Sequence, residues 1–253
     1  MAINGSFVAT AKPSQSVNPL SNRQEALKAG VKGFKFKIPG IKAASGNRIG
    51  GAVRGTDCVP KGDSIIALLP DTNIALTANG FPTLFVYIPA TNAKEGEFNL
   101  YEEANGNDPV YSTEVAVSKT PGIASISIPA NAKGLPLQYG KKYKWSFSLI
   151  CDAGDRAGDT RIEGWLQREQ QTVTLVNNLR NVKNKREIPS IYAEAGYWEE
   201  TLTSLAALRR ENPNDAGLKQ DWQNLLNDVG LGKIAPENLV ECCKTEVTSA
   251  ELQ

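Results

Sequence analysis

Histidine is absent from all 253 residues, which removes the most common catalytic acid–base group. Its absence excludes Ser-His-Asp and Cys-His nucleophiles, histidine-ligated zinc or non-haem iron, and an imidazole pH switch. The chain has no run of about 18 apolar residues, so no membrane-spanning helix is predicted. It also lacks the glycine-rich phosphate loop and the serine-hydrolase motifs. The sequence therefore favours a binding or structural role over catalysis and predicts no cofactor.

Cysteine is sparse, with Cys58, Cys151 and the adjacent Cys242 and Cys243. No C-x-x-C pair occurs, which argues against a thioredoxin-like redox site or a zinc ribbon. Cys58 precedes one apolar run and Cys151 ends another, so the two suit a bridge across a sheet in an oxidising compartment. Two free buried thiols fit this pattern equally well. The adjacent pair does not readily bond to itself, so it is interpreted as two thiols or as links to other chains.

Charge is balanced overall, at +1, but not along the chain. Residues 1–63 carry ten lysines and arginines against three acids, a net charge of +7. Such a region favours an anionic partner, such as nucleic acid, an acidic polysaccharide, a membrane surface or the acidic body of a neighbouring copy, and a solvated tail is the alternative. Single-stranded nucleic acid needs exposed aromatic rings beside the basic residues, and this region offers only three phenylalanines. The pattern therefore argues against nucleic-acid binding.

The first segment, 1–57, is a basic arm rich in glycine, serine and asparagine. Within it, residues 33–38 alternate apolar and basic side chains, which is the period of a strand with one wet face. The apolar members of this candidate assembly strand are Phe34, Phe36 and Ile38. The arm is too polar elsewhere to form a core of its own. We therefore expect it to add a strand to a sheet edge.

Residues 58–176 contain repeated short apolar runs that are separated by turn residues. The predicted strands are 64–69, 83–88, 97–101, 110–117, 123–128, 142–150 and 161–168. Short strands at this spacing predict an antiparallel β-sandwich of immunoglobulin or fibronectin-III type. Trp145 and Trp165 lie on two of these strands and are expected to fill the sandwich.

After a linker at 177–187, residues 188–232 change to helical periodicity. Three short helices are predicted, the first with Pro189 in its first turn and Gly196 at its end. The segment 195–213 looks like the second helix of a tetratricopeptide repeat, with a small residue, aromatics, an acidic pair and a closing proline. The predicted protein is mainly β with a C-terminal α part, a small TPR-like three-helix bundle, followed by a tail at 233–253.

Several motifs occur in a characteristic order over about residues 54–232. They are DCVP at 57–60, PTLFVYIP at 82–89, TPGI at 120–123, YGKKYKW at 139–145, CD at 151–152, DR at 155–156, EGW at 163–165 and YAEAGYW at 192–198. Together they resemble a cyanobacterial family described as domain of unknown function 928 (DUF928). The resemblance implies no established activity.

Members of that family look like exported proteins with a cleaved signal peptide. The resemblance therefore implies a periplasmic or extracellular address and favours the bridge between Cys58 and Cys151. This chain departs from the family pattern in its basic arm and in the missing signal, which we expect to have been removed.

A loop between two predicted strands is crowded with charge. Its charged residues are Asp152, Asp155, Arg156, Asp159, Arg161 and Glu163. The first and last acids have the spacing of a calcium loop, but the positions between them lack the required oxygen ligands and glycine. The two arginines can neutralise these acids, so we expect a salt-bridged hairpin and no metal.

The leading functional hypothesis is a non-enzymatic exported structural or interaction protein. It would form a homo-oligomer or filament by adding the arm strand to a neighbouring copy. A binding module for an acidic cell-surface polysaccharide is the alternative. A hydrolase with two carboxylates needs no histidine and is a remote third hypothesis.

Overall fold

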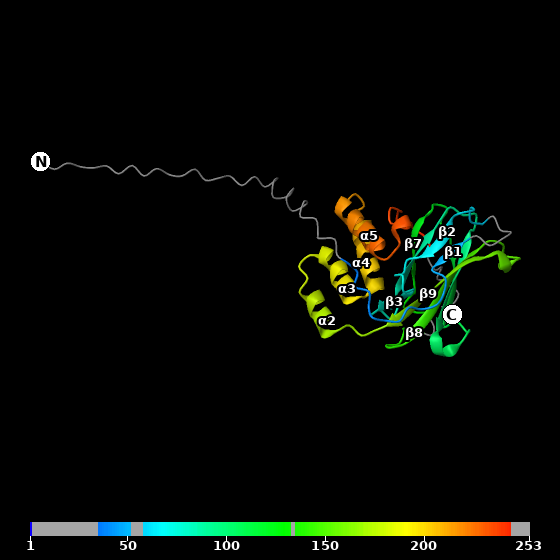
Figure 1. The fold of residues 1–253 in the computed structure, drawn as a ribbon, viewed down its shortest axis with the longest axis horizontal. Coiled ribbons are helices and arrows are strands. Elements are labelled where there is room, and N and C mark those ends of the chain that lie inside the picture. The colour runs from blue at the N-terminus through cyan, green and yellow to red at the C-terminus, as the bar shows by residue number, and fades with distance from the viewer. Residues whose placement is uncertain (2–34, 52–57, 133–134, 244–253) are drawn as a thin grey trace, which may run out of the picture. The chain divides into compact units, whose positions relative to one another are not determined.

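The computed structural model describes residues 35–51, 58–132 and 135–243, together with residue 1. Within these residues, strands fall between residues 49 and 168 and α-helices between 173 and 228. Figure 1 shows the strands gathered on one side and the helices α2 to α5 on the other. The prediction of a mainly β protein with a C-terminal helical part is confirmed. None of the helices in the described ranges is both long and apolar enough to cross a membrane.

The strands form two sheets. The four-stranded sheet has the order β1 (Ile49–Gly51), β2 (Ser64–Ala67), β4 (Thr83–Ile88) and β7 (Gly122–Ser127). The five-stranded sheet has the order β3 (Ile74–Thr77), β9 (Thr160–Arg168), β8 (Lys142–Ile150), β5 (Glu95–Glu102) and β6 (Tyr111–Ala116). All pairs are antiparallel except β3 with β9, which is parallel.

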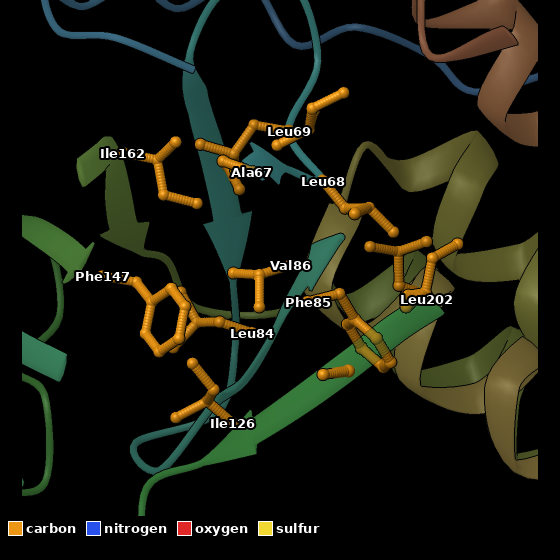
Figure 2. Packing of buried hydrophobic residues seen from close by; sticks show 14 of the residues in the cluster. Ala67, Leu68, Leu69, Leu84, Phe85, Val86, Ile126, Phe147, Ile162 and Leu202 are labelled. Atoms are coloured by element: carbon orange, nitrogen blue, oxygen red, sulfur yellow. The ribbon is translucent and has the colours of Figure 1, made fainter. Parts of the chain in front are cut away.

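Strand β8 explains why the two sheets stack. Its alternate side chains are almost completely buried, as was expected for Trp145: Tyr143, Trp145, Phe147 and Leu149. Figure 2 shows Phe147 and Ile162 of the five-stranded sheet facing Leu84 and Ile126 of the four-stranded sheet. The core therefore lies between the two sheets. Burying each such side chain contributes about 1.5–3 kcal/mol to the stability of the fold.

The α-helices are α2 (Val173–Arg180), α3 (Ile188–Ala195), α4 (Trp198–Glu211) and α5 (Ala216–Asp228). Helices α4 and α5 cover the other face of the four-stranded sheet, while α3 packs on α4 and α2 packs on α3. Phe85 of β4 points away from the sandwich towards Leu202 of α4 (Figure 2) and meets Trp222 of α5 edge-on, with 6.2 Å between ring centroids. The Trp198 indole N–H donates to the Leu68 carbonyl at 2.7 Å. One continuous core therefore joins the helices to the strands.

Three elements were not predicted: β1, β3 and α2. Strands β1 and β3 have only three and four residues, too few to produce a recognisable alternation. Helix α2 crosses from the predicted sandwich into the segment predicted as a linker, 177–187. Its signal is weak because only Leu175 is fully buried, packed beside Leu76 and Tyr197. The Thr172 side chain caps this helix by accepting from the Leu175 N–H at 3.2 Å.

The strand predicted at 33–38 is not present over residues 35–38, and Phe34 lies outside the described residues. Phe36 is 8% exposed and meets Trp198 edge-on at 4.7 Å between centroids. The Lys37 N–H donates to the Ala193 carbonyl at 3.0 Å, and Ile38 remains exposed. The alternating pattern was misleading because Phe36 packs against a helix, so the backbone bonds to the end of α3 and not to a strand.

Two disulfides are present. Cys58 is bonded to Cys151, with 5.2 Å between Cα atoms, as the family resemblance implied. Cys242 is bonded to Cys243, which corrects the interpretation of this pair as two thiols or interchain links. The backbone turns sharply there, since Cys243 has a φ of 60° and its N–H donates to the Ala116 carbonyl at 3.2 Å. This turn brings the adjacent sulfur atoms together.

Candidate functional site

The outer face of the five-stranded sheet carries a row of three large side chains. Tyr101 of β5 lies opposite Lys144 of β8, which in turn lies opposite Trp165 of β9. Directly opposed side chains on one face of a sheet are in contact range. Lys144 therefore lies between two aromatic residues on this face, each of them half-buried.

Trp165 was expected inside the sandwich and instead lies on this outer face. The inward positions of β9 around it belong to Gly164 and Leu166. Only glycine fits the inward position of Gly164, because Leu69 and Trp145 fill the space that a larger residue's side chain would need. The Trp165 indole N–H donates to the Ser45 carbonyl at 2.8 Å, which fixes the ring on the surface.

A groove of about 300 Å³ lies beside this row, and we call it the outer groove. Its lining residues come from β5, the short 3₁₀ helix η1 (Glu103–Asn105) and the turn after it, β8 and β9: Tyr101, Glu102, Glu103, Gly106, Asn107, Lys144, Arg161 and Trp165. The lining combines two aromatic rings, two cations and two carboxylates. Such a mixture suits a ligand that has both apolar faces and many polar groups.

The two cations of the groove share one acid. The ammonium of Lys144 and the guanidinium of Arg161 lie 2.9 Å and 3.1 Å from the same Oε1 of Glu163. One carboxylate neutralises only one of the two charges. Because Arg161 is exposed and Lys144 half-exposed, an anionic ligand can reach both cations.

The other carboxylates of the groove differ in their partners. Glu102 accepts from the ammonium of Lys141 at 2.5 Å, which neutralises it. The hydrogen bond with Glu102 raises the pKa of Lys141. Glu103 lies on the exposed surface of η1. The groove can thus offer carboxylate oxygens to hydroxyl groups as well as cations to acids.

The charged loop that the sequence singled out divides into two parts. Arg156 pairs with Asp159 at 2.5 Å and with Glu97 of β5 at 2.7 Å, which ties the loop to the sheet. Burial tends to raise the pKa of Glu97, but hydrogen bonds from Arg156 and Asn99 lower it below its usual value. Asp152 and Asp155 instead accept backbone N–H groups within the loop, at 2.8 Å and 3.0 Å.

Of the predicted loop residues, Arg161 alone lines the outer groove, and Glu163 holds it in place. The described parts of the chain contain no cluster of three or more acidic or cysteine residues that could hold a metal ion. The sequence reasoning missed Tyr101, Lys144 and Trp165 as a group. Lys144 could have been noticed, because it lies out of phase with the apolar side chains of β8, but its neighbours depend on the register.

A family model described as Domain of Unknown Function (DUF928) matches residues 49–239, which include every residue of the outer groove. The chain belongs to the DUF928 family. The match covers both sheets and helices α2 to α5, so the groove and the core beneath it are part of the family's domain. No curated protein matches the chain.

Proposed function

We propose that this DUF928 protein is a non-enzymatic, exported binding module for an acidic polysaccharide, which occupies the outer groove. The observation that carries the proposal is the row of Tyr101, Lys144 and Trp165, with the exposed Arg161 in the same groove. These side chains come from three neighbouring strands, so the rigid sheet sets their spacing.

The chemistry of a sugar acid matches this lining. A sugar ring presents apolar C–H groups on its faces. Tyrosine and tryptophan offer large apolar surfaces for these faces, and their polar O–H or N–H group can remain hydrogen-bonded. A sugar carboxylate forms charge-assisted hydrogen bonds with arginine and lysine. The carboxylate of Glu103 can accept from sugar hydroxyls.

An exported address belongs to the same proposal. Two disulfides are bonded, and disulfides persist mainly in oxidising compartments such as the periplasm and the cell exterior. The resemblance to a cyanobacterial family of exported proteins points the same way. We further propose that the sheets are related to immunoglobulin- or fibronectin-III-type sandwiches and that α3 and α4 are related to a TPR unit.

Self-assembly by strand addition is the second candidate function, because β6 is an edge strand of the five-stranded sheet. Within the described residues, the backbone of β6 pairs with β5 alone, apart from Ala116, which accepts from Cys243. The border of β7 is partly occupied, since Ile123 exchanges hydrogen bonds with Asn238 and Val240. Phe36 already packs in its own core, so an added strand would have to come from residues before 35.

Binding to polygalacturonate, measured by calorimetry with the full chain, tests the first proposal. We expect saturable binding that weakens as salt rises from about 20 mM to about 500 mM, because exposed charges are screened. The variants Trp165→Ala and Lys144→Gln should each weaken binding by about tenfold or more. Lys219→Gln removes the same charge from the exposed surface of α5, far from the groove in sequence, and should leave the affinity for polygalacturonate nearly unchanged at every salt concentration.

Binding of neutral amylose as tight as that of polygalacturonate would contradict the acidic preference. No binding of either polymer would remove the proposal. Light scattering then tests the second candidate: the intact chain should form a larger species than a chain without residues 2–34, and equal masses would exclude assembly through the arm.

A further inference from the structure

Two adjacent glutamates at the start of α4 are unusual because Glu199 is buried and Glu200 is half-buried. Glu199 is 3% exposed, and its Oε2 atom finds no hydrogen-bond partner among the described residues. The Oε2 atom of Glu200 is likewise buried without a partner there. None of the ion pairs found in the described ranges includes either residue. A buried carboxyl group without a partner requires an explanation, because burial penalises its charge.

The second glutamate is held in a fixed orientation by its other oxygen. The Oε1 atom of Glu200 accepts from the Thr77 hydroxyl at 2.8 Å and from the N–H groups of Ala78 and Asn79 at 2.8 Å and 3.0 Å. These three donors satisfy the hydrogen-bonding capacity of the Oε1 atom of Glu200. The Oε2 atoms of Glu200 and Glu199 have no such donor among the described residues.

Both glutamates line a cavity of about 330 Å³ between the segment 77–83 and the helices α3 and α4. We call this cavity the glutamate pocket. Its walls include the apolar side chains of Pro82, Ile188 and Ala207 and the aromatic side chain of Tyr192. A charged end and an apolar wall therefore share one space.

Stabilisation of the helix does not account for this arrangement. An acid in the first turn of a helix gains about 0.3–1 kcal/mol from the helix dipole, and a solvated side chain gains it without burial. Burial and the neighbouring charge of Glu200 raise the pKa of Glu199 well above its usual value. Burial also raises the pKa of Glu200, against the lowering effect of its three donors. None of the described residues that line the pocket is a lysine or an arginine.

We propose that the glutamate pocket binds a primary ammonium group carried on a short alkyl chain. The ammonium would supply a counter-charge by donating to the carboxylates of Glu199 and Glu200, whose covered Oε2 atoms would turn towards it on binding. Its methylene groups would pack on Ile188 and Pro82. Tyr192 supplies an aromatic wall that also attracts a cation. The site is separate from the outer groove and does not depend on the function proposed for it.

The geometry distinguishes an ammonium from other cations. A guanidinium forms two parallel bonds that match both oxygens of one carboxylate, whereas the two buried oxygens without a partner, Oε2 of Glu199 and Oε2 of Glu200, belong to different carboxylates. An ammonium has three diverging donors, which suit single oxygens from two different residues. A divalent metal would need about six oxygen ligands, and the described residues place no third acid with these two.

Titration of the full chain with n-butylammonium, followed by amide NMR and calorimetry, tests the proposal. We expect one saturable site whose occupation shifts the amide signals of Thr77, Ala78 and Asn79. The uncharged n-butanol has nearly the same shape and should bind at least tenfold more weakly. Butylguanidinium and calcium serve as competing cations and should also bind at least tenfold more weakly than n-butylammonium.

Two isosteric variants locate the site. Glu199→Gln and Glu200→Gln each remove one negative charge and keep an oxygen acceptor, so both should fold and both should weaken n-butylammonium binding by at least tenfold. Glu211→Gln changes an exposed glutamate at the other end of the same helix and should leave binding unchanged. Thermal unfolding of each variant confirms that it is folded under the conditions of the titration.

The source of the ammonium is distinguished by a second ligand, Nα-acetyl-lysine methylamide, which carries a lysine side chain on a peptide backbone. Tighter binding of this ligand than of n-butylammonium identifies a protein lysine as the partner, and weaker binding identifies a free amine. The proposal is wrong if n-butylammonium shows no saturable binding, or if n-butanol or calcium binds as tightly as n-butylammonium. It is also wrong if the two glutamine variants bind n-butylammonium as tightly as the intact chain does.

Discussion

The outer groove and the glutamate pocket use acidic residues in opposite ways. Beside the groove, Glu163 is partly exposed and is shared by Lys144 and Arg161, and water and salt screen these charges. In the pocket, Glu199 is buried, and the described residues around it include no lysine or arginine in the lining. The difference shows that the effect of a charged side chain on stability and binding depends on whether it is exposed or buried. The groove's charges cost little in folding and attract a ligand from solution, whereas the pocket's charge lowers the stability of the empty protein.

Removal of Trp198 should destroy the pocket and leave the groove. This residue precedes Glu199, fills the core beside Phe36 and donates to Leu68, so it positions the first turn of α4. We expect Trp198→Ala to lower the free energy of unfolding by about 3–5 kcal/mol through the cavity that it leaves. Urea denaturation measures this loss. A loss below about 1 kcal/mol would show that α4 is positioned by other contacts.

Removal of the bridge between Cys58 and Cys151 should weaken the sheets without changing either site directly. The bridge closes a loop with a sequence separation of 93 residues. We expect the double variant Cys58→Ala, Cys151→Ala to lose about 2–5 kcal/mol of unfolding free energy. Denaturation of the intact chain with and without a reductant provides the comparison. An unchanged midpoint would contradict a structural role for this bridge.

The variant Glu199→Gln should stabilise the protein in the absence of ligand. A carboxyl group whose pKa is raised in the folded state stabilises that state only while it is protonated in both states. Stability is therefore lost as the pH rises from the unfolded value, 4.5, towards the raised folded value. At pH 7 the glutamine variant avoids this loss and should be about 1–3 kcal/mol more stable.

The advantage of Glu199→Gln should shrink towards zero near pH 4, where the glutamate is protonated in both states. Thermal unfolding at several pH values measures it, with Glu211→Gln as the exposed control on the same helix. A difference that stays constant with pH, or a destabilised variant, would show that Glu199 has a compensating partner.

Removal of a groove cation should have the smallest effect on stability. We expect Arg161→Gln to change the free energy of unfolding by less than about 1 kcal/mol, because exposed ion pairs contribute little. Its effect on polygalacturonate binding should be larger than its effect on folding. A loss of stability comparable to that of Trp198→Ala would mean that the ion pairs with Glu163 hold the sheet together.

The fold was predictable where the pattern is local. The alternation in β8 and the helical periodicity of α3 to α5 depend on residues within one element, and both were predicted. Trp165 was misplaced because its side depends on the packing of Leu69 and Trp145 around Gly164. The arm was misread because Phe36 owes its position to Trp198, 162 residues further along the chain.

Neither site could be assembled from the sequence. The row of Tyr101, Lys144 and Trp165 exists only through the register of three strands. The adjacent glutamates are the acidic pair of the TPR-like pattern, and glutamate side chains are mostly exposed in proteins. Their burial depends on the segment 77–83, which folds over the start of α4 and donates to Glu200.

The most direct test of the proposed function follows the four indole N–H signals by NMR during a titration with oligogalacturonate. Trp145, Trp198 and Trp222 are buried, and Trp165 alone lines the outer groove. The proposal predicts that the Trp165 signal, assigned with a Trp165→Phe variant, shifts on binding while the other three do not. An unchanged Trp165 signal at saturating ligand would contradict it.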